Sequence, residues 1–415
     1  MGRNRVIYQS EALFTANGTD KTAHEAVNGE RQLLRVQDIS HGVELNRTDI
    51  NEFGQLTAID RQIIEPPTVN LDFSYYLHGG RNEGLLNFKE CTDRSNANTS
   101  GLVNAMSNFL KNDGGQNYYI SVAKEGNDAK TSGKSGSTLD GVIGIGNGYI
   151  TNYSVEAAVG DIPSASLTVE ANNLRFNASG TEIPNPGIDL DTGENEKGTI
   201  ADFEQASHTG TLSGKTDVVA AALRPGDITV DFNDEGNCLA ASSASATKDQ
   251  VQSLGGARLE GDGQMHLQNF TLDVPMARTA LNRIGSRFPY AREIDVPATI
   301  TFSCSAFLGD IEDGNLNSVI CKQGETRNIR VKMMQPCTGD GSANKNLGQE
   351  FLIKNCTLES QNFSASIGDN KTVDLVWSAQ VAGADDKTAG LFMWFGDGGT
   401  VDVSSDSVTV NPTDG

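Results

Sequence analysis

Long apolar runs, basic residues and closely spaced cysteines are what this sequence has least of. No apolar run is long enough to span a bilayer, and the opening MGRNRVIYQSEALF lacks the uninterrupted apolar core of a secretion signal. We therefore expect a soluble chain without membrane contact. Only 32 Lys and Arg face 54 Asp and Glu, which gives a formal net charge of -22. Because proteins grip nucleic acid with Lys and Arg, this balance argues against tight nucleic-acid binding.

Residues that carry catalysis or bind metals are also sparse. The six cysteines form no C-x-x-C pair, which argues against a zinc or redox site and favours free buried thiols; they are Cys91, Cys238, Cys304, Cys321, Cys337 and Cys356. The five histidines have no metal-ligand or catalytic-triad spacing, and His41 fits a structural position on its strand; they are His24, His41, His78, His208 and His266. We therefore expect no enzyme activity, no catalytic residue, no cofactor and no metal.

Two short motifs imitate binding loops. GIGNG at 144–148 is rich in glycine, but it precedes a strand and lacks the Lys-Ser/Thr of a phosphate loop, so a turn is expected. DLDTGENE at 189–196 offers oxygen ligands for a calcium ion without the full spacing of a calcium loop. A solvated acidic loop is the favoured interpretation.

Length and composition favour several β-rich units. The 415 residues exceed one ordinary core, and 45 glycines with abundant Ser, Thr, Asn and Asp favour short strands joined by turns. We expect a mainly β chain with little helix.

The most informative feature is an internal repeat. Residues 36–77 align without a gap to residues 267–308, with twelve identities in forty-two pairs. Each copy holds a loop of fifteen residues, NRTDINEFGQLTAID at 46–60 and ARTALNRIGSRFPYA at 277–291, where a β-hairpin needs only two. The long loop is therefore a repeated feature of the chain.

The segments after these copies follow the same order of elements. Copy one continues with a helical pattern at 102–111, a strand at 118–123 and a strand pair, and copy two with a helical stretch at 315–322, a strand at 327–334 and another pair. We expect a first unit at 1–176, a linker or arm at 177–262 that feeds the second unit, a second unit at 263–385, and a C-terminal strand and tail at 386–415.

Apolar and polar residues alternate along these strands, so one face of each sheet should be buried. The predicted fold is two tandem small β-sandwiches or partly closed barrels, each with a flanking helix and a long hairpin loop. The predicted core of copy one includes Val43, Leu45, Val69 and Leu71, and that of copy two includes Phe302 and Trp377. Trp394 should fill a core or meet a neighbouring subunit.

The charged residues on the opposite strand face are all acidic: Asp38, Glu44, Asp72, Glu156, Glu170, Asp273, Glu359 and Asp374. Such residues can simply keep a sheet in solution. They can also line a passage along which DNA slides, because an acidic wall repels the phosphates that basic side chains would hold.

With the repeat established, the sequence resembles the tail tube proteins, or major tail proteins, of long-tailed bacteriophages. The stretches that carry the resemblance are RVQDISHGVELNRTDINEFGQLTAIDRQIIEPPTVNLDFSYYL and ITNYSVEAAVGDIPSASLTVEANNL. The resemblance implies a β-sandwich with a flanking helix, stacked rings, a sheet-lined lumen and a long loop that reaches the adjacent ring. The acidic face would then be the lumen, through which DNA passes without tight binding.

The resemblance also assigns the loop residues and the partners. The inter-ring loop would use Arg47, Thr48, Asn51, Phe53, Gly54, Arg61, Arg278, Thr279, Asn282, Gly285 and Arg292. Single-domain tube proteins form rings of six, so a tandem subunit would close a pseudo-sixfold ring with three chains, rather than six chains with the second copy outside as decoration. Other partners would be tail tip, tape-measure and tail-terminator proteins, in a virion tail assembled in the host cytoplasm.

A different class of function is a carbohydrate-binding or adhesive β-sandwich, which the Gly- and Asn-rich loops would suit. It requires exposed aromatic residues for sugar stacking, and the sequence has only two tryptophans, Trp377 and Trp394. An enzyme is a third class, which no set of residues supports.

Overall fold

A computed structural model describes most of both repeat regions. The described residues are 11–17, 32–64, 66–91, 101–111, 115–123, 129, 139–177, 183–189, 194–195, 199–200, 223, 225–234, 256–258, 264–265, 267–307, 326–334, 347–364, 371–396, 399–402 and 409–412. The helix expected at 315–322 and three of the cysteines, Cys238, Cys321 and Cys337, lie outside them.

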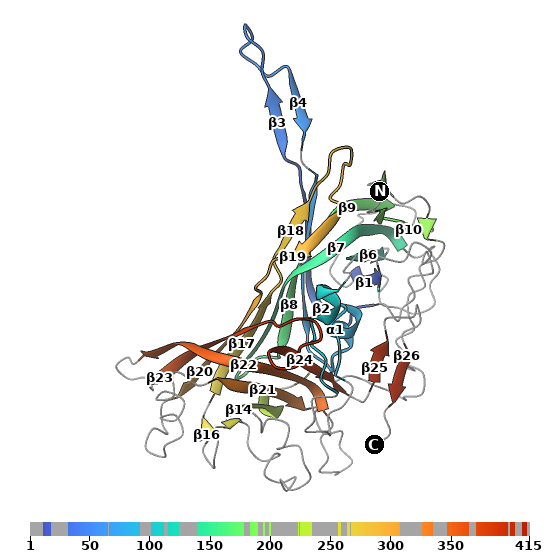
Figure 1. The fold of residues 1–415 in the computed structure, drawn as a ribbon. Coiled ribbons are helices and arrows are strands. Elements are labelled where there is room, and N and C mark those ends of the chain that lie inside the picture. The colour runs from blue at the N-terminus through green and yellow to red at the C-terminus, as the bar shows by residue number, and fades with distance from the viewer. Residues whose placement is uncertain are drawn as a thin grey trace.

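The fold is mainly β, and most of it is one 16-stranded, largely antiparallel sheet that does not close into a barrel (Figure 1). Eight strands form its inner layer, in the order β2 (Val36–Glu44), β5 (Thr68–Tyr76), β8 (Ser164–Ala171), β7 (Leu139–Ala158), β17 (Leu267–Pro275), β20 (Thr299–Phe307), β23 (Thr372–Gln380) and β22 (Leu347–Ser364).

A second layer covers the apolar face of the inner layer. It is built around the N-terminal halves of β7 and β22, which continue from one layer into the other. In the first half of the chain β7 is joined by β6 (Gln116–Ala123), β1 (Glu11–Asn17) and β9 (Asn173–Asn177). In the second half β22 is joined by β21 (Arg327–Met334), β14 (Ile228–Asp234) and β24 (Gly390–Phe395).

The remaining elements are short. Two helices, α1 (Arg81–Leu85) and α2 (Ser107–Leu110), lie between β5 and β6. Four hairpin strands are β3 (Arg47–Ile50), β4 (Asp60–Ile63), β18 (Arg278–Leu281) and β19 (Ala291–Ile294). The others are β10 (Ile183–Pro184), β11 (Ile188–Asp189), β12 (Glu194–Asn195), β13 (Thr199–Ile200), η4 (Pro225–Asp227), β15 (Gly256–Arg258), β16 (Gln264–Met265), β25 (Gly399–Asp402) and β26 (Thr409–Pro412).

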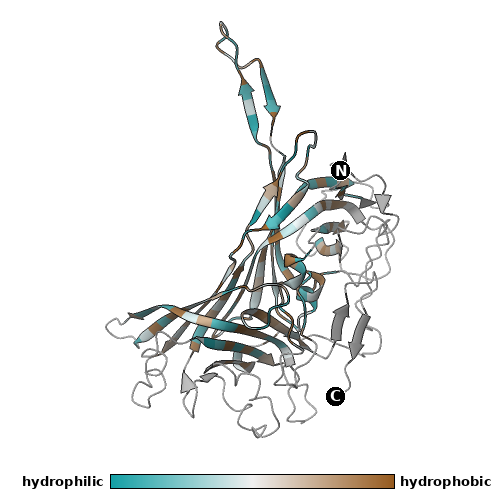
Figure 2. Ribbon diagram, viewed as in Figure 1, coloured by the Kyte–Doolittle hydropathy of each residue, from teal (hydrophilic) through white to brown (hydrophobic). Residues whose placement is uncertain are grey.

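The period of two along the inner strands places alternate side chains in a continuous core, so brown and teal alternate along the strands in Figure 2. Val69, Leu71, Phe302 and Trp377 are almost fully buried, as their parity predicts. Val43 and Leu45 were expected in the same core, and this expectation is wrong: they are 46% and 45% exposed because β2 is the last strand of the sheet. Trp394 is buried within the second layer.

The expectation of a turn at GIGNG is also wrong. Residues 144–148 lie inside the single long strand β7, at the point where it passes from the outer to the inner layer. Asn147 has a φ of 50°, which bends the strand without ending it. The acidic stretch 189–196 supplies β11 and β12 where it is described.

A buried carboxylate ties helix α1 to the inner layer. Glu83 accepts hydrogen bonds from the hydroxyls of Tyr75, at 3.0 Å, and Tyr153, at 3.2 Å. Burial raises the pKa of Glu83 above its ordinary value, against the opposing effect of these hydrogen bonds. The helix is thus held by a polar cluster as well as by the apolar contacts of Leu85 and Leu86.

The segment after α1 also joins the two halves of the chain. The backbone N–H of Cys91 donates to Met393 of β24 at 2.9 Å, and that of Phe395 donates to Glu90 Oε1 at 3.1 Å. Burial raises the pKa of Glu90 to about 7. The protonation of Glu90 is therefore linked to the contact between the two halves.

From the raised pKa of Glu90 we predict that the free energy of unfolding falls as pH rises. Its pKa is about 7 in the folded chain against an ordinary 4.5, so the folded state binds more protons between these values. The contribution is complete below about pH 4.5 and lost by pH 8, at a cost of about 3 kcal/mol. Glu90→Gln keeps an acceptor for Phe395 and should flatten this part of the pH profile. Denaturant unfolding at several pH values measures it, and a parallel profile in the variant would contradict it.

Candidate functional site: edges, arms and an acidic face

Among the described residues, nine strands of the first half correspond in order and pairing to nine of the second: β1–β9 in one, β14 and β17–β24 in the other. The registers also correspond. Phe73 of β5 lies opposite Leu167 of β8, and its sequence counterpart Cys304 of β20 lies opposite Leu375 of β23. The correspondence between 36–77 and 267–308 thus continues into strands whose sequences are not alike.

Irregularities in the strands correspond as well. β7 has a bulge at Thr151 and β22 has one at Glu359, each against the neighbouring strand of its half. Asn147 and Asn355 both have positive φ, at 50° and 64°. Each donates its backbone N–H to an Asn side chain of the adjacent strand, at 2.9 Å to Asn117 and 3.1 Å to Asn328. The bend between layers therefore has the same construction in both halves.

The halves meet where β17 pairs with the C-terminal half of β7. The pairing is antiparallel from Asn269 opposite Ala158 to Pro275 opposite Asn152. At this junction the apolar side chains of β17 are buried: Phe270 is 4% exposed and Val274 is fully buried. This edge-to-edge junction makes the inner layer continuous.

The corresponding positions at the two ends of the inner layer are uncovered. β2, the counterpart of β17, has no strand on its outer edge within the described residues, and neither has the part of β22 beyond Leu358 that corresponds to the paired part of β7. Val43 and Phe363 are each 46% exposed, whereas their counterparts Val274 and Val155 are fully buried. The free edge of β2 therefore corresponds to that of β17, and the free edge of β22 to that of β7, the two strands that pair within the chain.

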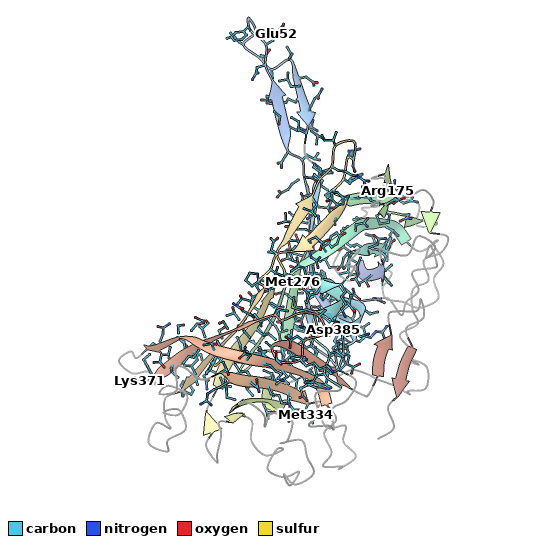
Figure 3. All side chains as sticks on the ribbon, in the orientation of Figure 1. Glu52, Arg175, Met276, Met334, Lys371 and Asp385 are labelled. Atoms are coloured by element: carbon cyan, nitrogen blue, oxygen red, sulfur yellow. The ribbon has the colours of Figure 1, made fainter. Side chains whose placement is uncertain are left out.

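The two long loops are β-ribbons, called arm 1 (residues 46–64) and arm 2 (residues 277–294). Arg47 lies opposite Ile63 in β3–β4, and Arg278 opposite Ile294 in β18–β19. Gly54 and Gly285 have φ of 95° and 91° in the two tips, a conformation that suits glycine. Arm 1 extends far from the body, with Glu52 at its far end, whereas arm 2 lies along the sheet (Figures 1 and 3).

Arm 2 is held by two arginines at its base. Arg278 donates to the carbonyl of Ile150 at 3.3 Å, beside the β7 bulge, and its guanidinium lies 5.1 Å from the centre of the Tyr149 ring. Arg292 is buried and binds the carboxylate of Glu170 at 2.6 Å and the side-chain oxygen of Asn172 at 3.0 Å. The arm is therefore anchored to the first half of the chain.

In arm 1 the corresponding arginines, Arg47 and Arg61, are exposed. Its predicted residues Arg47, Thr48, Asn51, Phe53, Gly54 and Arg61 are all exposed. Arg61 pairs with Asp49 of the same ribbon at 2.7 Å. In arm 2, Asn282 and Gly285 are exposed in the tip, and Thr279 donates to Asp295 at 2.7 Å.

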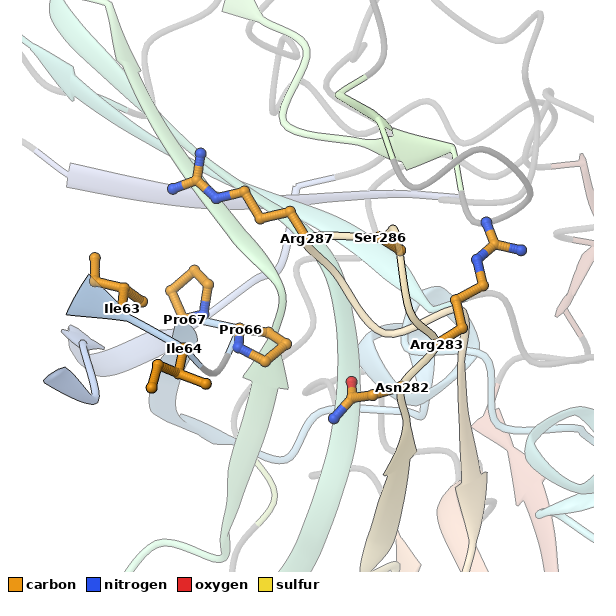
Figure 4. Close-up of a pocket in the computed structure, with 8 residues that line it drawn as sticks. All are labelled: Ile63, Ile64, Pro66, Pro67, Asn282, Arg283, Ser286 and Arg287. Atoms are coloured by element: carbon orange, nitrogen blue, oxygen red, sulfur yellow. The ribbon is translucent and has the colours of Figure 1, made fainter. Parts of the chain in front are cut away.

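A groove of about 410 Å³ separates the tip of arm 2 from the base of arm 1 (Figure 4). Its lining residues are Ile63, Ile64, Pro66, Pro67, Asn282, Arg283, Ser286 and Arg287. Apolar side chains from arm 1 face polar side chains from arm 2 across it, so the two arms lie next to each other at one end of the sheet.

The eight acidic residues predicted on one face are brought together there. Seven lie on the side of the inner strands opposite the core, as the strand registers show: Asp38, Glu44, Asp72, Glu156, Glu170, Asp273 and Asp374. Glu359 is the bulge residue of β22 and accepts a hydrogen bond from Ser378 of the same face. No Lys or Arg occurs in the six whole strands of this layer, nor in 149–158 of β7 or 357–364 of β22. The strands themselves thus contribute only acidic charge to this face, and Arg292 of arm 2 reaches it at Glu170.

Sequence reasoning missed the residues that receive arm 2, namely Tyr149, Ile150 and Asn172. The repeat contained a partial signal, because Arg278 and Arg292 are among the identities, but a single sequence cannot tell which surface they bind. Among the described residues no group of three His, Cys, Asp or Glu could hold a metal ion. No described helix is long and apolar enough to cross a membrane. Cys91, Cys304 and Cys356 are buried free thiols.

The anchoring of arm 2 predicts a difference between equivalent arginines. Arg292→Ala removes a buried charge-assisted contact and should lower the free energy of unfolding by about 2 kcal/mol. Arg61→Ala, the matched change in arm 1, removes only an exposed pair and should change it by less than about 0.5 kcal/mol. Urea denaturation of the two variants at a concentration where the chain is monomeric measures both. Equal losses would contradict the asymmetry.

Comparison with known proteins returned only distant structural likenesses. No protein-family model and no curated protein matches the chain. The tail of an empty gene transfer agent particle, with C6 symmetry, has 15% identity and a TM-score of 0.18 over 30% of this chain and 88% of that one. A native gene transfer agent virion has 14% identity and a TM-score of 0.17, over 33% of this chain and 83% of that one. An Hcp protein has 13% identity and a TM-score of 0.17, over 29% of this chain and 74% of that one. With TM-scores this low, the likenesses carry no argument about function.

Proposed function

We propose that the chain is a structural, non-enzymatic subunit of a bacteriophage tail tube, built from two tandem tube domains. The observation that carries the proposal is the β7–β17 junction, together with the two uncovered edges that match its halves. A second chain that places its β2 on β22 of the first would repeat this junction between molecules. Such a head-to-tail contact generates a ring when the rotation closes.

The intrachain register specifies the proposed contact. Val274 lies opposite Tyr153 and Leu272 opposite Val155 within the chain. The same alignment between chains places Val43 opposite Gln361 and His41 opposite Phe363. It would bury the apolar side chains of Val43 and Phe363, and unpaired strand edges with exposed apolar residues favour such pairing.

Three chains per ring is the stoichiometry that we propose. Each chain supplies two equivalent four-stranded sheets, so three chains would provide the six units of the single-domain family that the sequence resembles. Both halves keep the arm and the inner strands, which supports equal roles in the ring over a decorative second half. Stacked rings would meet tail tip, tape-measure and terminator proteins in the virion tail.

The acidic face would line the lumen of this tube. Seven of its carboxylates lie on the side opposite the core, the inner strands lack Lys and Arg outside the outer-layer part of β22, and the rest of the face is mainly Ser, Thr and Asn. Such a wall repels the phosphates of DNA while it remains hydrated, so DNA would pass during ejection without being held. The carbohydrate-binding alternative gains no support, since Trp377 and Trp394 are both buried.

Electron microscopy of the purified protein tests the proposal directly. We expect rings or stacked tubes, with three chains and pseudo-sixfold density in a rotational average of the cross-section. A chain that stays monomeric under all conditions and is absent from a virion tail would contradict the tube role. A ring of six chains with second halves outside would contradict the stoichiometry only.

The edge contact predicts the effect of Val43→Asp. The residue is exposed in the single chain, so folding should be retained, but a ring would bury an unpaired carboxylate. The critical concentration for assembly, measured by sedimentation, should rise at least about tenfold. Phe176→Asp, an equally drastic change at an exposed position of β9, should leave assembly within about twofold. Equal effects of the two substitutions would count against the β2 edge.

The lumen assignment predicts that a positive wall slows DNA. Replacing Asp72, Glu156 and Asp374 together by Lys should permit assembly and slow DNA release from particles, most strongly at low salt. The matched control replaces the same three residues by Asn, Gln and Asn, which removes charge without adding attraction. If both variants release DNA at the same rate at low salt, the face does not contact DNA.

A further inference from the structure

We propose that Arg61 of arm 1 binds Glu359 and Gln380 of a second copy of this chain, as a latch that closes each ring laterally. The inference rests on the proposed function and adds to it a specific contact and a direction. It assigns the base of the arm to the contact between neighbours within a ring, whereas the family resemblance assigns the whole loop to the adjacent ring.

The template is the intrachain contact of arm 2. Arg292 extends from β19 across the junction and binds Glu170 and Asn172, which belong to the other half of the chain. Its counterpart in arm 1 is Arg61, at the same position of the ribbon and identical in type. The base of arm 2 lies on β7 and β8, next to the pairing of β17 with β7. If β2 pairs with β22 of a second chain, the base of arm 1 would lie on β22 and β23 of that chain in the same way.

The strand registers identify the receiving residues in the second half. Glu170 lies opposite Tyr149 of β7, and the corresponding position opposite Thr357 of β22 is Ser378. Asn172 follows Ala171 at the end of β8, as Gln380 follows Ala379 at the end of β23. An amide is therefore kept at one position, while the carboxylate at the other is replaced by a hydroxyl.

The missing carboxylate is supplied from the bulge. Glu359, the bulge residue of β22, accepts a hydrogen bond from Ser378, so its carboxylate lies next to the position that Glu170 occupies in the first half. The corresponding bulge residue of β7 is Thr151, which carries no charge. Each half thus has one carboxylate at the receiving site: Glu170 from β8 in the first half and Glu359 from β22 in the second.

Arg61 retains donors for this contact. Asp49 engages its Nε and Nη2, and the group that binds the carboxylate in arm 2 is Nη1. The counterpart of Asp49 in arm 2 is Ala280, which cannot bind Arg292. Asp49 therefore leaves the Nη1 group available for Glu359, whereas the Nε group, which binds Asn172 in arm 2, would have to leave Asp49 in order to reach Gln380.

A second arginine supports the same direction. Arg278 binds the carbonyl of Ile150 beside the β7 bulge, and Arg47 is its counterpart in arm 1. The corresponding carbonyl beside the β22 bulge belongs to Leu358. The two arm bases would then lie along neighbouring sheets, and only the tips around Gly54 and Gly285 would remain to reach beyond the ring.

A charge-reversal cycle on the full chain tests the latch. Arg61→Glu and Glu359→Arg should each raise the critical concentration for ring assembly at least about tenfold, measured by sedimentation at constant ionic strength. The double variant should return to within about threefold of the unmodified chain. Lys89→Glu, the same charge change at an exposed residue away from the arms, should have no effect. Asp49→Ala should not weaken assembly.

The outcomes separate the latch from the tube role. If the unmodified chain forms no rings, the proposed function fails and the latch with it. If the unmodified chain forms rings and Arg61→Glu assembles as well as Lys89→Glu does, the latch is wrong while the tube role stands. Rings that form but do not stack in Arg61→Glu would place Arg61 between rings instead and would also overturn the latch. A double variant no better than its parents would exclude direct pairing of the two residues.

Discussion

The antiparallel pairing of β17 with β7 is the contact on which the rest of the structure depends. It fixes one register across the inner layer, and in a β-sheet a shift by one residue turns every side chain to the other face. With this register, the apolar residues of both halves face one core and the carboxylates face the other side. It also aligns the two bulges and directs both arms to the same end of the sheet. A single strand pair therefore sets the core, the acidic face and the position of the arms together.

The two halves differ in the chemistry of their outer layers. In the outer layer, the second half contains a buried ion pair between Arg330 and Glu350, whereas the corresponding residues of the first half are Tyr119 and Val142. Burying two charges costs desolvation free energy, so the ion pair and the uncharged residues at these positions are not energetically equivalent. The arms keep the same loop length, the tip glycines Gly54 and Gly285, and two pairs of arginines, Arg47 with Arg278 and Arg61 with Arg292. This contrast is expected if the inner layer must join end to end while the outer layer only has to cover it.

The sequence was sufficient for features that depend on local periodicity. Alternation predicted the inner strands and the burial of Trp377, and the repeat predicted a long loop in each half. It failed where the answer depends on what lies next to a strand. Val43 and Val274 are identical and lie on equivalent strands, yet one is exposed and the other buried, because only β17 has a neighbour on both sides. The glycine-rich 144–148 was misinterpreted for a similar reason, since a bend inside a long strand and a turn between two strands have the same composition. The residues that receive arm 2 come from β7 and β8, far from the arm in sequence.

Linking two units in one chain changes how their contacts can form. Arm 2 meets its receiving site within the same molecule, where the covalent connection supplies a high effective concentration, so this contact is complete in the single chain. An arm that must bind another molecule faces the opposite requirement: it has to remain available without associating at random. The pair between Arg61 and Asp49 meets this requirement, because it satisfies part of an exposed guanidinium within the ribbon. Exposed ion pairs of this kind contribute little free energy, so a better-placed carboxylate can compete with Asp49 or share the arginine once two edges have come together. With the proposed latch, the difference between the arms has a reason. Arm 1 would need Asp49 while it waits for a second chain, whereas arm 2 has Ala280 at this position because Arg292 is already bound within its own chain.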